Sequence, residues 1–415
     1  MATVLTETPS PGLYDMAPGV FTENPVGSGL YDFDTPYLVE DPTSPGLYII
    51  FGDTTVIVNA DPAIIGNRAA SWRIDLLNND GSPAGTLDGV DGGSLEWSTA
   101  QIKGRGTLNV TDSGQGVDWL NVRIKPVYIL NDTTEWPRSI FIPTAPVETW
   151  VGGVRSWSVD MLDKSCVLAQ DRVDSYYSLA AGVNVINTVR ALITGAGENA
   201  GAITDSTETL TVAKVWPIGT PKLTIINDLL NSIGYFALYV DMNGQFRAEP
   251  YTRPAQRPTV YTFIDDSDSI YGDTFTRDVD IYGIPNKVLH VSQGTSGAEA
   301  LTSVATNEDP NSPYSYANRG RWIVNDDAAT PVDVTSQEAL DTITRRDLIN
   351  STSVTATVDI VHAPLEGVEI NAAVQFANTP AGVDARHVIT HTTLTIEAAG
   401  ALALAATTLR EVVDL

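Results

Sequence analysis

Short segments in which apolar and polar residues alternate, each bounded by turn-forming residues, recur along most of this chain. In the first half they cover residues 71–76, 93–97, 106–110, 121–130, 139–142 and 155–161. Alternation with a period of two is typical of β-strands buried on one face, and Asn79-Asp80-Gly81 after the first segment is a hairpin signal. Short strands at such spacing predict a β-barrel or β-sandwich over residues 65–175.

Helical spacing replaces this pattern between residues 176 and 260. The apolar residues of the two predicted helices are Val185, Ile186, Val189, Leu192 and Ile193, then Ile225, Ile226, Leu229, Leu230 and Ile233. For the second helix we expect Thr220 as the cap, Pro221 in the first turn and Gly234 at the end. Residues 235–250 then form an aromatic hairpin with its turn at 241–244, so this stretch predicts a small α+β domain.

Strand patterns return from residue 261 to the end of the chain. Residues 281–291, 353–361, 374–377 and 388–397 are the predicted strands. One helix interrupts them: Thr335 and Glu338 form a capping box, and Leu340, Ile343 and Ile349 lie on its buried side. We therefore expect a mainly β fold with a small α+β part, in which residues 261–415 are a second β-barrel or sandwich with a helical insert.

The first 64 residues contain an internal repeat. Gly-Leu-Tyr occurs three times, and the glycines Gly12, Gly29 and Gly46 are spaced 17 residues apart. Each unit predicts turn, short strand, turn and short strand, which is too little to bury a core of its own. We interpret residues 1–64 as an arm that docks on the rest of this chain or on a neighbouring subunit. The candidate docking residues are Leu13, Tyr14, Leu30, Tyr31, Leu47 and Tyr48. The alternative is a disordered N-terminus, which repeated apolar pairs disfavour.

Charge and cysteine content exclude several classes. The formal net charge is −27, so binding of nucleic acid through a basic patch is not expected, and an acidic wall suits a passage for DNA better. Cys166 is the only cysteine, which excludes an intramolecular disulfide and fits a reducing cytoplasm. We see no signal peptide and no apolar stretch that would insert into a membrane.

Three groups of residues have a partial likeness to chemical sites. His387 and His391 are four apart, but on a strand their rings would lie about 13 Å apart, too far for one metal ion. Asp265, Asp266 and Asp268 lack the glycine and the final glutamate of a calcium loop, so a solvated turn is the better interpretation, with a weak ion site left open. Cys166 has no histidine signature and is expected to be a buried small residue. We predict no metal, no cofactor and no catalytic residue.

The tryptophans leave two interpretations open. Trp72, Trp97, Trp119 and Trp157 fall on alternating strand positions, which favours the core of the first β domain. Eight Trp and fifteen Tyr could instead line a sugar-binding surface. The second interpretation makes the chain a receptor- or glycan-binding protein.

The segments together carry a resemblance to a known family. The capped helix that ends at Gly234 and runs into the hairpin 235–250, the step at 283–288, the pair 381–389 and 394–396, and the strand 156–160 resemble hub proteins of long phage tails and contractile injection machines. The chain looks most like minor tail proteins of actinobacterial phages. The N-terminal repeat lies outside the family pattern.

The resemblance implies a non-enzymatic structural subunit of the tail tip, made in the host cytoplasm and located in the virion. It implies a homo-oligomer, a trimer, whose two β-barrels per subunit form a pseudo-sixfold ring that closes the tail tube. The implied partners are the distal tail protein, the tape measure and other minor tail proteins, with genomic DNA only as passing cargo. Ring contacts of this kind are large and apolar.

Overall fold

A computed structural model of the chain describes residues 68–99, 103–266, 269–272, 274–278, 282–292, 300–326, 332, 337–352, 354–397 and 403–412, and four short strands before residue 52. The chain divides into two units, Met1–Asn59 and Ala60–Leu415, and each is described by itself.

The first unit contains two small antiparallel pairs. Strand β1 (Thr6–Glu7) pairs with β2 (Tyr14–Asp15), and β3 (Tyr37–Glu40) pairs with β4 (Tyr48–Phe51). Tyr14 and Tyr48 of the repeats therefore each begin a strand. Leu13, Leu30, Tyr31 and Leu47 lie outside the described residues, so the docking role of the arm stays a prediction.

One 14-stranded sheet dominates the second unit, which confirms the mainly β fold class. From the first half of the chain it takes β5 (Ala70–Asn78), β6 (Pro83–Thr86), β7 (Val90–Ser98), β8 (Gly104–Thr111), β9 (Val122–Leu130), β10 (Thr134–Pro137), β11 (Phe141–Val151) and β12 (Val154–Asp163). From the second half it takes β17 (Thr259–Ile264), β18 (Thr276–Asp278), β22 (Val354–His362), β23 (Ala373–Asn378), β24 (Val383–Glu397) and β25 (Ala405–Val412). Among the strand pairs that the structure describes in this sheet, only β17–β23 is parallel.

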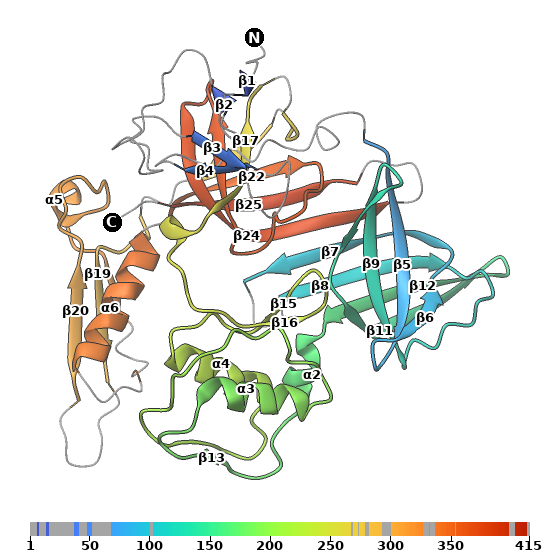
Figure 1. Ribbon diagram of the computed structural model, residues 1–415, viewed down its shortest axis with the longest axis horizontal. Coiled ribbons are helices and arrows are strands. Elements are labelled where there is room, and N and C mark those ends of the chain that lie inside the picture. The colour runs from blue at the N-terminus through green and yellow to red at the C-terminus, as the bar shows by residue number, and fades with distance from the viewer. Residues whose placement is uncertain are drawn as a thin grey trace. The chain divides into compact units, whose positions relative to one another are not determined.

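The two halves share this sheet through β24, which pairs with β7 over residues 391–397 (Figure 1). The 15-residue length of β24 lets it serve two apolar cores. Ile389 packs into a core with Phe263 and Phe376, whereas Leu394 packs into a core with Leu95 and Phe141. The first core is therefore completed by a strand from the far end of the chain.

The α+β part contains the three helices α2 (Ser165–Gln170), α3 (Val185–Thr194) and α4 (Lys222–Ser232), the short pairs β13 (Tyr177–Leu179) with β14 (Lys214–Trp216) and β15 (Tyr239–Val240) with β16 (Phe246–Arg247), and the 3-10 turn η1 (Pro254–Gln256). All predicted apolar residues of α3 are buried, as are those of α4 up to Leu230. The predicted cap of α4 is wrong. Pro221 occupies the N-cap, and the Thr220 hydroxyl donates to the Pro217 carbonyl instead, which removes it from the helix.

The helical insert forms a separate layer. Strand β19 (Lys287–Val291) lies between β20 (Thr302–Thr306) and β21 (Val324–Asp326), the short α5 (Tyr316–Arg319) precedes β21, and α6 (Gln337–Thr352) packs on β19 and β20 (Figure 1). Polar contacts join the helix to the strands: Ser303 Oγ donates to Asp341, His290 Nε2 lies 2.9 Å from Asp347, and Gln337 Nε2 donates to the Thr302 carbonyl. Leu340 is buried as predicted, whereas Thr335 lies outside the described residues.

A buried histidine makes the second core sensitive to acid. His362 Nδ1 donates to the Ala363 carbonyl at 2.7 Å, and Nε2 accepts from the Thr407 hydroxyl at 2.9 Å, so the neutral ring satisfies both nitrogens. Burial lowers the pKa of His362 to about 4. In the unfolded chain this histidine has a pKa near 6.5 and binds a proton below that pH. In the folded chain it stays neutral until the pH approaches 4. Stability is therefore lost as the pH falls from about 6.5 towards 4.

We expect this residue to cost about 2 kcal/mol of unfolding free energy between pH 7 and pH 5. Urea unfolding of the wild type and of His362→Gln at both pH values measures the effect, because the other acid-sensitive groups are common to both proteins. The variant should lose about 2 kcal/mol less than the wild type over this interval. Parallel losses in the two proteins would mean that His362 accepts a proton in the folded state.

Candidate binding site beside the first core

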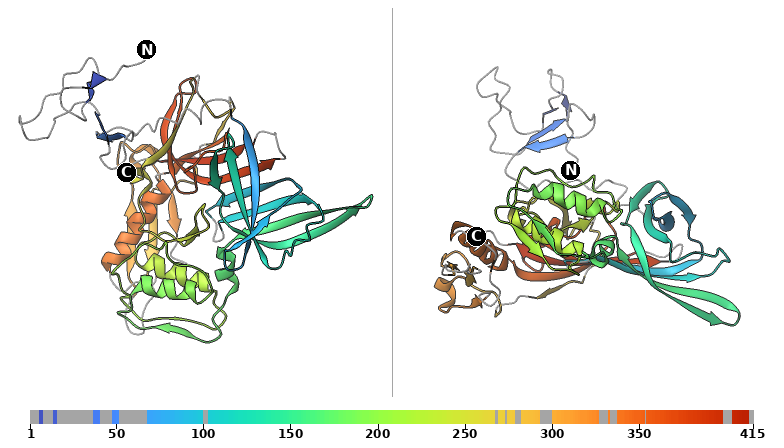
Figure 2. Two further views of the ribbon diagram at one scale, coloured as in Figure 1. Left: turned by 45° about the vertical axis from the view of Figure 1, so that its right-hand side comes forward. Right: turned by 90° about the horizontal axis from the view of Figure 1, so that it is seen from below.

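The β11–β12 hairpin extends beyond the neighbouring strands at one end of the sheet (Figures 1 and 2). Gly152 and Gly153 form its turn and both have positive φ (58° and 86°), which suits a two-residue hairpin turn and disfavours any side chain. Pairing of β12 with β8 ends at Ser156, opposite Thr111. The tip therefore stands out from the sheet with both of its faces available.

The two faces of this hairpin differ in chemistry. Trp150 is directly opposite Arg155, and Glu148 is directly opposite Trp157, so these four side chains share one face. The other face carries Val147, Val151 and Val154, all more than half exposed. One side of the tip is thus aromatic and charged, and the other side is aliphatic.

The aromatic face is ordered by contacts among its own side chains. Arg155 lies over both indole rings, with its guanidinium carbon 5.6 Å from the Trp150 centroid and 5.7 Å from the Trp157 centroid. Trp150 Nε1 donates to Glu148 at 2.8 Å. These contacts hold the Trp150 ring in place although 62% of the residue's surface is exposed.

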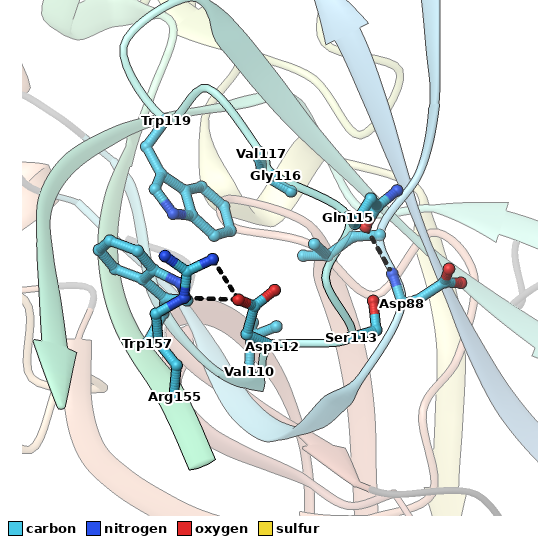
Figure 3. A pocket seen from close by; sticks show the side chains of 11 residues that line it. Asp88, Val110, Asp112, Ser113, Gln115, Gly116, Val117, Trp119, Arg155 and Trp157 are labelled. Carbon is cyan, nitrogen blue, oxygen red and sulfur yellow. Dashed lines mark hydrogen bonds and ion pairs between the residues drawn. The ribbon is translucent and has the colours of Figure 1, made fainter. Parts of the chain in front are cut away.

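A pocket of about 210 Å³ adjoins this face at the end of the first core (Figure 3). It is lined by Leu87, Asp88, Val110, Asp112, Ser113, Gln115, Gly116, Val117, Trp119, Arg155 and Trp157. In Figure 3 the carboxylate of Asp112 lies between the Trp119 side and the Gln115 side of the pocket. Trp119 and Trp157 contact each other with centroids 6.0 Å apart, so the aromatic face continues into the pocket wall.

Local folding places the polar groups of the pocket. Asp112 directly follows β8 and accepts hydrogen bonds from the Gly114 N–H and from Arg155, and both lower the pKa of its carboxyl. Gln115 closes the loop against the β6–β7 turn: its Oε1 accepts from the Asp88 N–H, and its Nε2 donates to the Thr86 carbonyl. The carboxylates of Asp88, Asp112 and Glu148 outnumber the single guanidinium of Arg155, so the site favours neutral ligands over anions.

A larger cavity of about 710 Å³ lies between the α+β part and the second core. Several of its polar groups are already paired within the protein. The Tyr239 hydroxyl donates to Glu249, and Arg257 donates to the carbonyls of Thr252 and Asn371 while stacking on Phe236.

The prediction that the four tryptophans belong to the first core is confirmed, and two of them also line the pocket. Trp97 and Trp119 are buried, and Trp72 and Trp157 pack partly buried against the first core. Trp119 and Trp157 also line the pocket, so the core and the surface interpretations meet at this point. Trp150 and Arg155, which complete the aromatic face, were not among the candidate residues from the sequence.

The described histidines, aspartates and cysteine that were considered in the sequence as metal or catalytic residues do not come together in one site. His387 is buried with Nδ1 on the Ala385 carbonyl, while His391 contacts Glu96 at 3.1 Å, beyond a bulge in β24. Asp265 accepts from Thr379, and Asp268 lies outside the described residues. Burial raises the pKa of the Cys166 thiol to about 11, which fits a packing residue. Within the described ranges no group of three or more His, Cys, Asp and Glu could hold a metal ion.

The helices that the structure describes include none that is long and apolar enough to cross a membrane.

Solved structures of phage tail proteins share this fold. A tail protein from Neisseria meningitidis is 12% identical, with a TM-score of 0.61, covering 82% of this chain and 97% of that one. The 43 kDa tail protein of prophage MuSo2 from Shewanella oneidensis is 13% identical, with a TM-score of 0.60, covering 82% and 98%. Prophage tail protein gp18 from Listeria monocytogenes is 15% identical, with a TM-score of 0.52, covering 81% and 94%. No family model and no curated protein matches the sequence. The chain therefore has a phage-tail-protein fold.

Proposed function

We propose that the chain is a structural, non-enzymatic subunit of a phage tail, located at the tail tip as part of its hub. The observation that carries the proposal is the extent of the fold likeness: the match covers 97% and 98% of two tail proteins, so it includes nearly their whole architecture. Because the short sequence segments resemble minor tail proteins of actinobacterial phages, we propose that the chain is a protein of this kind.

In this proposal three copies form a ring that closes the tail tube. The ring would contact the distal tail protein, the tape measure and other minor tail proteins, and genomic DNA would pass it only as cargo. The net charge of −27 supports passage over binding, because acidic walls repel the phosphate backbone. The chain would be made in the host cytoplasm and would reside in the virion.

Two surfaces support contacts with other subunits. The valine face of the β11–β12 hairpin exposes Val147, Val151 and Val154 on one side of a projecting tip. Contiguous exposed apolar groups of this kind occur at protein–protein contacts. The Gly-Leu-Tyr arm is the second candidate surface, and we propose that it docks on a neighbouring subunit.

The double variant Tyr31→Ala, Tyr48→Ala tests the arm. Removing two aromatic anchors should reduce incorporation into particles at least tenfold, because buried aromatic residues dominate interface energies. Because residues 1–59 form their own unit, the melting temperature of the remaining fold should change little. Quantitative immunoblots of purified particles measure incorporation, and Tyr282→Ala, at an exposed tyrosine of the other unit, serves as the control. Normal incorporation of the double variant would remove the arm from the proposal.

Gold-antibody labelling of intact virions in negative-stain electron microscopy tests the location. We expect label at the tail tip only, or label that emerges only after the tip is disrupted. Label along the tube or on lateral fibres would refute a hub. Mass photometry of the purified protein then tests the trimer.

A further inference from the structure

The exposed aromatic face of the hairpin suggests a ligand with a flat apolar side and polar edges. Trp150 is held by Arg155 and Glu148 with its ring in solvent, so little conformational entropy is lost when something stacks on it. A pyranose ring has such a shape, since its C–H groups form an apolar face and its hydroxyls point outward.

The face and the pocket are continuous. Arg155 bridges Trp150 and Trp157, and Trp157 contacts Trp119 in the pocket wall. At about 210 Å³ the pocket is smaller than the roughly 300–1,000 Å³ of sites for drug-sized ligands, which suits a single sugar ring. A second ring of the same chain would then lie outside the pocket, over Trp150.

The polar groups fit hydroxyls better than charged substituents. Ser113 carries a hydroxyl at the pocket, and Asp112 and Gln115, although hydrogen-bonded within the protein, keep further lone pairs for a ligand hydroxyl (Figure 3). The excess of carboxylates repels phosphate and carboxylate groups. Nucleic acid is disfavoured for the same reason, although bases also stack on tryptophan.

We propose that this site binds a neutral glycan, with one pyranose ring in the pocket beside Trp119 and Trp157 and the next ring on Trp150. The inference goes beyond the structural role above and does not rest on it, because it concerns the purified protein alone. It gives the chain a second activity, the recognition of neutral sugars.

Saturation-transfer NMR on the full chain tests the site with glucose, galactose, mannose and N-acetylglucosamine, and with the trisaccharide of any unit that binds. At least one monosaccharide should receive saturation. Ser113→Phe, at an exposed loop position, should abolish that signal by filling the pocket. Trp150→Ala should weaken the trisaccharide about tenfold, the effect of losing one stacking contact, and should weaken the monosaccharide less than the trisaccharide.

Trp322→Ala is the matched control, since Trp322 is also exposed but lies in the helical insert, and it should change neither signal. Circular dichroism checks that each variant is folded. Three results would overturn the proposal: no transfer to any of the four sugars, transfer that persists in Ser113→Phe, or glucuronic acid binding as tightly as glucose. If the Trp150→Ala variant binds both ligands normally, Trp150 is not a second subsite and the exposed aromatic face does not bind the glycan.

Discussion

Replacing Glu198 by Gln is expected to lower the free energy of unfolding by about 3–5 kcal/mol. Glu198 accepts from Arg123 of β9 at 2.6 Å and lies 2.9 Å from the ammonium of Lys164, which follows β12. All three side chains are largely buried. Removing the single anion leaves two cations without compensation at the junction between the sheet and the α+β part, and the cost of that desolvation drives the loss.

The pH dependence of this effect has a defined sign. Burial alone would raise the pKa of Glu198, but hydrogen bonds from Arg123 and Lys164 outweigh burial and lower it from its ordinary value of about 4.5. A carboxyl with a lowered pKa contributes stability above its unfolded pKa and loses it as the pH falls through the folded value. The difference between wild type and Glu198→Gln should therefore be complete at pH 7 and shrink below about pH 4.5.

Asp205→Asn provides the control for urea unfolding at pH 7. Asp205 pairs with Arg190 in the same α+β part but is almost fully solvated, so its loss should cost less than about 1 kcal/mol. Similar losses for the two variants would mean that Glu198 is solvated in solution and that the junction is held by apolar packing alone.

Local patterns in the sequence were sufficient for most of the individual elements. Alternation between residues 71 and 76 predicted β5, and apolar spacing around Val189 and Leu229 predicted α3 and α4, because each element buries one face and its period follows from its own geometry. The failure at Thr220 is also local. A threonine before a proline predicts a cap, but the Thr220 hydroxyl donates to the preceding Pro217 carbonyl.

Pairing between distant strands was beyond these patterns. Strand β24 was predicted as part of a second β domain, yet residues 391–397 pair with β7, about 300 positions earlier. Alternation tells which residues of a strand are buried and leaves open the core that buries them. The two β regions predicted at 65–175 and 261–415 therefore share a sheet that their residue ranges do not reveal.

The sequence predicted two tryptophans of the candidate site but not the hairpin tip beside them. The sequence pattern of Trp119 and Trp157 allows either core or sugar-binding residues, and in the structure both pack with the first core and line a pocket. The missing half is the tip of β11 and β12. Gly152-Gly153 between two segments of alternating apolar and polar residues is a hairpin signal, and a two-residue turn there places Trp150 opposite Arg155. The pocket itself depends on loops 87–88 and 112–119 meeting, which no local pattern predicts.

Replacing Leu394 by Ala should destabilise the first core by about 2–5 kcal/mol, although the residue belongs to the last fifth of the chain. Leu394 is 3% exposed, is directly opposite Leu95 of β7 and packs with the buried residues of the first half. Truncation leaves a cavity in this core, and the lost apolar contacts and the cavity both add to the cost. Six of the eight tryptophans lie between residues 72 and 157, so tryptophan fluorescence during urea unfolding reports on this core.

Leu404→Ala is the matched control, because Leu404 lies just before β25 but is 40% exposed and should cost less than about 0.5 kcal/mol. A shared sheet also predicts that Ile389→Ala, in the second core, shifts the same fluorescence transition, since β24 carries both residues in one strand. If Leu394→Ala leaves the fluorescence midpoint unchanged, the first half folds without β24. If only Ile389→Ala leaves it unchanged, the two cores unfold separately and β24 is a hinge between them. A common shift would make the pairing of β24 with β7 the contact that joins the two halves into one cooperative unit.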